Sequence, residues 1–296
     1  MRLHHVAPVA LRGMIPFSGI LRAAKRRIIR YSDNPANSAL AIAQGLDQLS
    51  ALSRAGISVA GAELLEFGSG SLPIIPLLFH LAGARQVTLT DVERLMDAHT
   101  TGLAKERIAA SLDTVEAALR LPRDLLLQRL DSFAPRYLVP WRPDEVGDNE
   151  VDLVISRATL EHVPRATLAS FLRVFHRILR PGGAMCHVID NSDHWQHSDR
   201  SLSRISFLRY SDSSLLWRLA QLNMQAYQNR LRHSDCRAMF EDAGFRVLVE
   251  MGEPDEQCLR DLRSIRLAPQ FAGRDPRDLC ILTSLFVAVK PSHERS

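Results

Sequence analysis

The sequence predicts an α/β fold in which helices cover both faces of a seven-stranded sheet whose last strand is antiparallel. Two apolar runs, 62–67 and 86–90, have the pattern of strands; the first enters a glycine turn and the second is followed by a carboxylate. A third run, 151–156, is largely apolar and bounded by polar residues, which is typical of a strand buried on both faces. Amphipathic periodicity predicts helices between these runs. Strands that alternate with helices indicate a mainly parallel sheet.

The first half of the chain supplies the elements around the glycine turn. A helical stretch at 33–60, broken at Asn34-Pro35, precedes the first strand. The helix after the turn carries Pro73 and Pro76 at its start, where missing amide hydrogens cost least. The other elements expected here are that helix at 74–81, helical periodicity over 92–132 divided by Pro122, and strands at 137–139 and 151–156.

The second half predicts a helix–strand unit, a long insertion and a terminal hairpin. An amphipathic helix reaches Leu179, and the turn Arg180-Pro181-Gly182-Gly183 stops it before a strand at 184–190. After the insertion, Ser234 is the predicted N-cap of a helix that Gly244 ends. The hairpin is expected to consist of strands 245–250 and 280–289, with the second antiparallel beside the first.

Composition favours one large domain. The chain has 296 residues, of which 46% are hydrophobic, and no run approaches the about 20 apolar residues of a membrane span. The four cysteines lie far apart without a C-x-x-C pair, so we expect reduced thiols and a cytoplasmic protein. No metal-binding constellation is expected from the spacing of histidines and cysteines. The expected division is a basic helical extension at 1–60 and a main domain at 61–296.

Positive charge is concentrated at the N-terminus. Residues 1–60 hold eight basic and two acidic residues, whereas the remainder holds 29 basic and 31 acidic ones. The near-neutral main domain gives no reason to expect nucleic acid as a partner. Residues 11–31 mix isoleucine and leucine with cations, so they have two interpretations: peripheral contact with an anionic membrane, or a solvated helix packed on the domain. The oligomeric state is left open.

The glycine turn predicts a nucleoside pocket. Gly68 and Gly70 follow the first strand and Asp91 follows the second, an arrangement that lets backbone approach a ligand while a carboxylate holds ribose hydroxyls. The third glycine of a dinucleotide-binding turn is absent. Glu66 precedes the turn, and a carboxylate there suits a cationic ligand better than a pyrophosphate.

The pattern E-x-G-x-G with the later Asp91 resembles motif I of class I S-adenosylmethionine-dependent methyltransferases. Two further stretches resemble the same family in the correct order: Asp152–Ser156 with Leu160-Glu161-His162-Val163, and Leu179-Arg180-Pro181-Gly182-Gly183 before the next strand. Dehydrogenases with a Rossmann fold lack the last two. The resemblance implies a Rossmann-like sheet, methyltransferase activity and S-adenosylmethionine as the cofactor.

A closer resemblance concerns the region after residue 188. The stretches Val188–His194, Phe207-Leu208-Arg209-Tyr210-Ser211 and Asn229-Arg230-Leu231-Arg232 are similar to a bacterial methyltransferase subfamily associated with polysaccharide and secondary-metabolite gene clusters. This resemblance bears on the fold more than on the acceptor.

The family resemblance assigns roles on the cofactor side. Glu66, Gly68 and Gly70 would hold the methionine part of the cofactor, and Asp91 the ribose. Val92 and Trp141 would flank the adenine, although plain core packing explains either residue equally well. Ser156 and Arg157 would close the far wall.

Four residues are candidates for catalysis. His162 follows the strand at 151–156, on the ligand side, and an imidazole suits proton abstraction at neutral pH; capping of a helix is the alternative. Asp190, Asp193 and His194 follow the next strand and could form an oriented base pair or ligate a metal. A polar loop with internal hydrogen bonds is the other interpretation.

The insertion at 191–232 is expected to be a substrate cap, because a loop this long is usually functional and its aromatic content argues against disorder. Aromatic, hydroxyl and guanidinium groups suit sugars, phosphates or carboxylates. Alternatively, its arginines pair with aspartates nearby. The candidate substrate-binding residues are Trp195, Arg209, Tyr210, Asn229, Arg230 and Arg232.

Three functions remain open at this point. The first is O-methylation of a small-molecule or glycan-type acceptor. The second is methylation of a lipid or quinone-like acceptor at a membrane surface. The third is a non-catalytic cofactor-binding protein with a regulatory or assembly role. A nucleic-acid methyltransferase is disfavoured, because the proline-proline-aromatic turn that stacks an extruded base is missing after residue 156.

Overall fold

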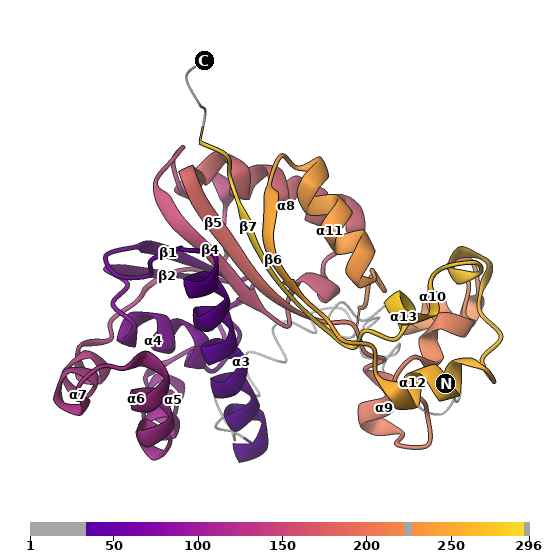
Figure 1. Cartoon of the computed structure of the whole chain (residues 1–296), viewed down its shortest axis with the longest axis horizontal. Coiled ribbons are helices and arrows are strands. Elements are labelled where there is room, and N and C mark those ends of the chain that lie inside the picture. Colours follow the sequence, from indigo (N-terminus) through magenta and orange to yellow (C-terminus); the bar gives the residue numbers. More distant parts are fainter. Residues whose placement is uncertain (1–33, 222–226, 293–296) are drawn as a thin grey trace.

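The fold is built on a seven-stranded sheet with the order β3-β2-β1-β4-β5-β7-β6. The computed structural model describes residues 34–221 and 227–292. Strands β1 to β5 pair in parallel, and β7 is antiparallel to both of its neighbours (Figure 1). The strands are β1 Glu63–Phe67, β2 Gln86–Thr90, β3 Arg136–Leu138, β4 Val151–Arg157, β5 Leu179–Asp190, β6 Arg246–Met251 and β7 Thr283–Val289. The predicted sheet and its antiparallel last strand are confirmed.

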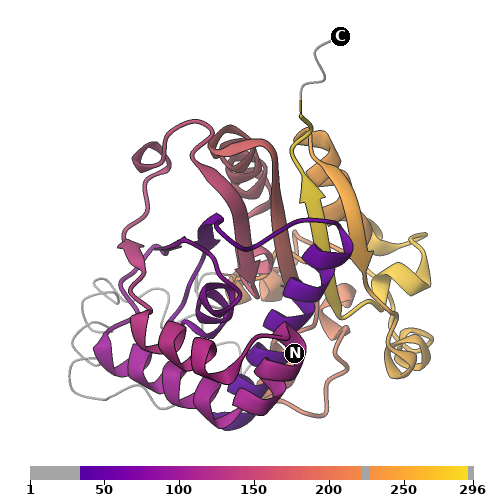
Figure 2. The same cartoon turned by 60° about the vertical axis from the view of Figure 1, so that its left-hand side comes forward.

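Two helical layers cover the sheet (Figures 1 and 2). One face carries α3 Pro35–Arg54, α4 Ile74–Leu81, α5 Ala98–Ala110, α6 Leu112–Leu119 and α7 Arg123–Ser132, and the other carries α8 Arg165–Ile178 and α11 His233–Asp242. Because side chains alternate along a strand, neighbours enter different cores. Leu64 belongs to the α3–α7 core and Leu65 to the α8–α11 core.

A third apolar cluster forms a side lobe next to the carboxyl end of the sheet (Figure 1, lower right). It joins two segments, 205–217 and 258–282, that are distant in sequence. Its short elements are α9 Trp195–Ser198, η3 Ser206–Arg209, α10 Leu215–Ala220, α12 Glu256–Leu262, η5 Pro269–Phe271 and α13 Pro276–Leu279. Thus the segment between β6 and β7 supplies half of the lobe, which the sequence analysis did not foresee. Whether the insertion at 191–232 acts as a substrate cap remains a prediction.

The predicted N-cap at Ser234 is wrong. Helix α11 begins at His233, and the backbone N–H of its N-cap Arg232 donates to Asp235 Oδ2 at 2.9 Å. The Ser234 hydroxyl instead donates to Asp278 Oδ2 at 2.7 Å. An aspartate three residues after Arg232 therefore provides the capping interaction that was expected from Ser234.

The four cysteines are buried and unpaired, as expected of reduced thiols. Within the described ranges, no helix is both long and apolar enough to cross a bilayer. The basic segment 11–31 lies outside the described residues, so its contact with a membrane remains a prediction.

Candidate active site

The two glycines of the turn after β1 differ in the space around them. Both glycines have positive φ, 75° for Gly68 and 63° for Gly70, a conformation that side-chain-bearing residues rarely adopt. A Cβ on Gly68 would lie 2.3 Å from Thr159 Cγ2, whereas a Cβ on Gly70 would meet no atom of the described residues within 4 Å. Gly68 is therefore required for packing against the loop after β4, and Gly70 leaves its backbone accessible to a ligand.

Asp91 is held beside this turn. Its Oδ2 accepts a hydrogen bond from the Gly70 N–H at 2.9 Å, and its Oδ1 accepts one from the Val92 N–H at 2.7 Å. The Glu93 N–H makes a longer bond of 3.4 Å to the same Oδ1. A carboxylate has about four acceptor positions, so Oδ2, which accepts one bond, keeps a position for a hydroxyl group of a ligand. Val92 is 82% exposed, which leaves its side chain free to flank a ligand. Its predicted adenine contact stays a prediction.

Glu66 is a buried carboxyl group under the turn. It is only 4% exposed, and its Oε2 has no hydrogen-bond partner within the described part of the chain. Burial raises the pKa of Glu66 to about 8, with a smaller upward contribution from Asp91 and opposing contributions from Ser69 and Arg157. A cationic ligand group beside Glu66 would favour the ionised form. The carboxyl group is thus suited to a ligand that carries an ammonium or sulfonium.

Ser156 and Trp141 face the protein interior instead of a ligand. The Ser156 hydroxyl lies 2.8 Å from His187 Nδ1 and is fully buried. Its side chain therefore does not supply the predicted wall. Trp141 stacks on Phe171 with ring centroids 5.4 Å apart, which is the core-packing alternative.

Arg157 lies at the end of β4, between the two halves of the site. Its Nε donates to Gln44 Oε1 of α3 at 2.6 Å. Burial lowers the pKa of Arg157, and the charges of Glu161, Asp190 and Glu66 oppose that shift. The guanidinium is therefore the positive charge shared by the carboxyl groups from β1, β4 and β5.

A cleft of about 530 Å³ opens at the carboxyl ends of β4 and β5, under α3. We call it the β4–β5 cleft. The residues that line it include Leu40, Gln44, Leu72, Arg157, Asp190, His197 and Arg204. Leu72 belongs to the segment that follows the glycine turn, so the cleft adjoins the proposed cofactor half.

Asp190, which lines this cleft, lies next to His194. His194 Nε2 lies 3.3 Å from Asp190 Oδ2, and Asp190 Oδ1 accepts from the Ser192 N–H at 2.9 Å and from its hydroxyl at 2.6 Å. Burial would raise the pKa of Asp190, but His194 and Ser192 together lower it to about 2. Asp190 is therefore ionised at neutral pH, and its charge lies within ion-pair distance of the His194 imidazole.

Glu161 and His162 follow the carboxyl end of β4 and lie close to His194. Their 3-10 turn, η2 Leu160–His162, places one ligating atom each of Glu161, His162 and His194 within 4.8 Å of one another. His162 Nδ1 lies 2.7 Å from the Tyr227 carbonyl oxygen, so it carries the proton and donates. Burial lowers the pKa of His162, with a smaller lowering from His194 and opposing contributions from Tyr227 and Asp190. A neutral His162 is therefore favoured, with Nε2 as an acceptor.

Residues 36–250 match a family model described as a methyltransferase domain. The chain belongs to this methyltransferase family. The recognition as a class I methyltransferase, the prediction of an enzyme and the choice of S-adenosylmethionine as cofactor are confirmed. The closer bacterial subfamily remains a prediction.

Solved structures with a similar chain course include three methyltransferases. An S-adenosylmethionine-dependent methyltransferase from Mesorhizobium loti has 15% sequence identity and a TM-score of 0.46, and the match covers 82% of this chain and 99% of that chain. An S-adenosylmethionine-dependent methyltransferase from Methanosarcina mazei has 17% identity and a TM-score of 0.42, with coverage of 79% and 94%. Phosphoethanolamine N-methyltransferase 2 of Haemonchus contortus, in complex with S-adenosyl-L-methionine, has 16% identity and a TM-score of 0.45, with coverage of 83% and 52%. No curated protein matches the chain.

Three of the predicted substrate residues of this methyltransferase are buried in its side lobe or at its base. Trp195 packs in a small apolar cluster. Arg230 donates to the Phe207 carbonyl at 2.9 Å, pairs with Asp212 and lies over the Trp217 ring. Arg232 is 1% exposed and donates to the carbonyl oxygens of Asn191 and Arg230. Their side chains organise the insertion, and none of the three lines the β4–β5 cleft.

The other predicted residues have different positions. The Asn229 amide donates to the carbonyl oxygens of Leu160 and Val163 at 2.7 and 2.8 Å, so it ties the insertion to η2. Arg209 is exposed and Tyr210 half-buried, and neither lines the cleft. Asp193 is buried, and its Oδ1 accepts from the Trp195 N–H at 2.9 Å. Burial raises the pKa of Asp193 to about 6. Asp193 is not among the residues that line the cleft, and its catalytic role stays a prediction.

Several residues that line or support the site were missed. Gln44 on α3 fixes Arg157, His197 and Arg204 line the cleft, and Glu161 faces the two histidines. Gln44 lies in a helix that also buries Ala41 and Ile42. A polar residue next to these buried positions was the signal in the sequence that could have indicated its role. Glu161 was visible in the sequence only as part of a family motif.

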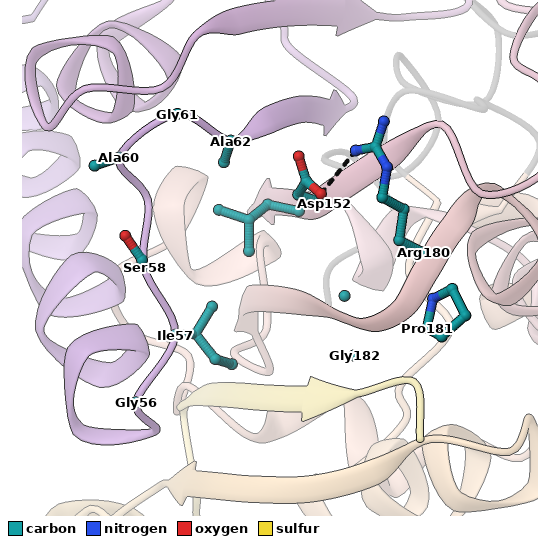
Figure 3. A pocket seen from close by; sticks show the side chains of 12 residues that line it. Gly56, Ile57, Ser58, Ala60, Gly61, Ala62, Asp152, Arg180, Pro181 and Gly182 are labelled. Atoms are coloured by element: carbon teal, nitrogen blue, oxygen red, sulfur yellow. Dashed lines mark ion pairs between the residues drawn. The ribbon is translucent and has the colours of Figure 1, made fainter. Parts of the chain in front are cut away.

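A second hollow of about 480 Å³ lies at the opposite, amino end of the sheet (Figure 3). It is lined by the loop before β1 and by the starts of β4 and β5. Its two charged residues, Asp152 and Arg180, form an ion pair of 2.7 Å with each other. Ligands of open α/β sheets bind at the carboxyl ends of the strands, so we assign the active site to the β4–β5 cleft.

Proposed function

We propose that this methyltransferase transfers the methyl group of S-adenosylmethionine to an oxygen atom of a small hydroxylated acceptor, such as a sugar or a glycan-type molecule. The observation that carries the proposal is that Asp190, which lines the β4–β5 cleft, has its Oδ2 only 3.3 Å from His194 Nε2. Methyl transfer to an alcohol gains from a positioned base, whereas transfer to a soft or anionic nucleophile does not need one.

The size and polarity of the cleft support a small acceptor. A volume of about 530 Å³ lies within the range of small-molecule sites. Arg157, Arg204 and Asp190 give it charged and hydrogen-bonding groups of both signs. Such a lining fits a polar molecule with several hydroxyl groups better than an apolar chain.

The reaction would be an in-line displacement. Glu66 and Asp91 would hold the cofactor so that its methyl group points toward the cleft, and closure around the acceptor would exclude water. A bond forms between the acceptor oxygen and the methyl carbon, while the carbon–sulfur bond breaks and its electron pair stays on sulfur. The hydroxyl proton passes to the His194 imidazole, and Asp190 stabilises the resulting imidazolium.

The two alternative functions have less support. Membrane-surface methylation depends on residues 11–31, outside the described ranges. A non-catalytic role would leave unexplained why an oriented Asp–His pair accompanies Glu66 and Asp91 at one edge of the sheet.

The test is a transfer assay with S-adenosylmethionine labelled in its methyl group. The acceptors are monosaccharides, oligosaccharides, phenols, amines, thiols and lipid vesicles, and the labelled product is located by mass spectrometry. The proposal expects label on a hydroxyl oxygen of a small soluble acceptor and loss of transfer in Asp190→Asn. Labelling of amines, thiols or vesicle lipids, with no labelled hydroxyl compound, would overturn it.

A further inference from the structure

We propose that Glu161, His162 and His194 form a binding site for a divalent transition-metal ion at the carboxyl ends of β4 and β5. The site is separate from the cofactor turn, and its existence does not depend on which acceptor the enzyme methylates. Three independent features of the structure support it.

The first feature is the donor set. Two imidazoles and one carboxylate supply ligating atoms within 4.8 Å of one another, and His162 Nε2 lies 4.0 Å from Glu161 Oε1. Metal–ligand bonds of about 2.0–2.2 Å place neighbouring ligands roughly 3–3.5 Å apart, so side-chain rotations of about 1 Å would close the group on an ion. Imidazole with carboxylate suits zinc, cobalt, nickel, iron or manganese ions, whereas calcium and magnesium prefer oxygen ligands alone.

The second feature is the unsatisfied state of Glu161. Its side chain is 3% exposed, and within residues 34–221 and 227–292 neither of its carboxylate oxygens has a hydrogen-bond partner. A buried carboxyl group without partners is costly. A cation between Glu161 and the two histidines would supply the missing interaction.

The third feature is the support behind the ligands. His162 Nδ1–H donates to the Tyr227 carbonyl at 2.7 Å, which leaves Nε2 facing Glu161 as the lone-pair donor. A metal-bound histidine almost always donates its other N–H to a carbonyl or carboxylate in this way. Asn229 fixes the η2 backbone through its amide group, and its N–H donates to the Glu161 carbonyl at 2.8 Å. Two of the three ligands, Glu161 and His162, are therefore carried on a braced turn.

The surrounding charges are compatible with a bound cation. Asp190 on β5 lies 3.3 Å from His194 Nε2, so it offers a second carboxylate, and a fourth possible ligand, next to the group. Arg157 on β4 opposes a cation, but Gln44 holds its guanidinium by Nε. His197 on α9 stacks on His194 with ring centroids 5.3 Å apart. The nearby carboxyl groups of Glu161 and Asp190 thus offset the positive charge of Arg157.

An ion here would lie beside the β4–β5 cleft, which Asp190 lines. The following consequence rests on the proposed function: an acceptor hydroxyl that coordinates the ion would become more acidic. With His194 engaged as a ligand, Asp190 would then receive the proton. Asp190 is needed in either form of the reaction.

The test is titration of the full-length, chelator-treated protein with Co²⁺ and with Zn²⁺, in the absence of cofactor and acceptor. Calorimetry gives the affinity and the visible absorption of bound Co²⁺ reports its ligands. We expect one saturable site, and an affinity roughly tenfold to a hundredfold weaker in His162→Gln, His194→Gln and Glu161→Gln. His80→Gln, on the opposite face of the sheet, is the matched control and should bind like the wild type.

Folding is controlled by circular dichroism and by melting curves with and without Co²⁺. We expect Co²⁺ to raise the melting temperature of the wild type and His80→Gln, and not that of Glu161→Gln. In chelator, Glu161→Gln should melt at or above the wild-type temperature, because it removes a buried acid. Wild-type binding that is absent, or that is equally strong in the folded Glu161→Gln and His162→Gln variants, would overturn the proposal without bearing on methyl transfer.

Discussion

The two halves of the site differ in how they are assembled. The cofactor half takes Glu66, Gly68, Gly70 and Asp91 from one β-turn-α-β segment, so the groups that face the ligand lie close together in sequence. The acceptor half joins α3, the end of β4, the end of β5 and the insertion, which are up to about 190 residues apart along the chain. The cofactor half therefore depends on local backbone geometry, and the acceptor half on distant contacts.

The largest expected effect concerns the distant contacts. Arg232→Met should lower the free energy of unfolding by about 3 kcal/mol, because the buried carbonyl oxygens of Asn191 and Arg230 lose a charged donor. Urea denaturation measures this change. Arg209→Met, at an exposed position of the same insertion, is the control and should stay within about 0.5 kcal/mol of the wild type. Equal unfolding midpoints for the two variants would mean that Arg232 does not brace the acceptor half.

The next effect separates catalysis from cofactor binding. Asp190→Asn should lower kcat by about a hundredfold on an acceptor found in the transfer assay, because His194 loses the carboxylate that orients it. The Kd for S-adenosylmethionine should stay at the wild-type value, since Asp190 belongs to the other half. Calorimetry and rate measurements on one preparation give both numbers. A parallel loss of cofactor affinity would contradict the division into two halves.

The two glycines of the turn offer a matched comparison within the cofactor half. Both have positive φ, so an alanine at either position costs about 1–2 kcal/mol. Only Gly68→Ala adds a clash with Thr159, so its free energy of unfolding should be about 1 kcal/mol lower than that of Gly70→Ala. Gly70→Ala should instead keep more stability and lose cofactor affinity, because its methyl group occupies the open side. Thermal melting measures the stability of the two variants, and calorimetry measures their affinity for the cofactor. A Gly70→Ala variant that is the less stable of the two and binds the cofactor more tightly than Gly68→Ala would refute the assignment of the open side to the ligand.

The smallest expected effect is the release of protons when the cofactor binds. The pKa of Glu66 is about 8 in the ligand-free protein, so most of its carboxyl groups are neutral at pH 7. A cationic cofactor favours the ionised form, and binding at pH 7 should release up to one proton. Calorimetry in buffers of different ionisation enthalpy measures this release. Glu66→Gln should abolish it, and a release that persists in the variant must come from another group.

The difference between local backbone geometry and distant contacts also explains which parts of the structure could be predicted from the sequence. Strands β2 and β4 were predicted within one residue. Strand β4 is a largely apolar run, as expected of a buried parallel strand, and β2 alternates Val87 and Leu89 with β-branched threonines. The predicted start of the last strand at Cys280 was three residues early. Cys280 and Leu282 are apolar because they pack in the side lobe, which a single run of sequence does not distinguish from a strand.

The metal-binding group shows the limit of local patterns. The separate strand-end positions of His162 and His194 were predicted from the sequence, but their proximity was not. It depends on the parallel pairing of β4 with β5, in which Arg157 lies opposite Val188, and on the turn that directs Glu161 inward. Arg230 pairs with Asp212, which is the alternative that the sequence offered for the arginines of the insertion. The buried partners of Arg232 are backbone carbonyl groups, which leave no signal in the sequence.

The central claim is that the glycine turn and Asp91 form the S-adenosylmethionine pocket. Its most direct test is calorimetric titration of the wild type and Asp91→Ala with S-adenosylmethionine and, separately, with NAD. The account predicts saturable binding of S-adenosylmethionine alone, weakened about tenfold to a hundredfold in the variant through loss of charge-assisted bonds to the ribose. Unchanged affinity in a folded Asp91→Ala variant, or binding of NAD in its place, would contradict the account.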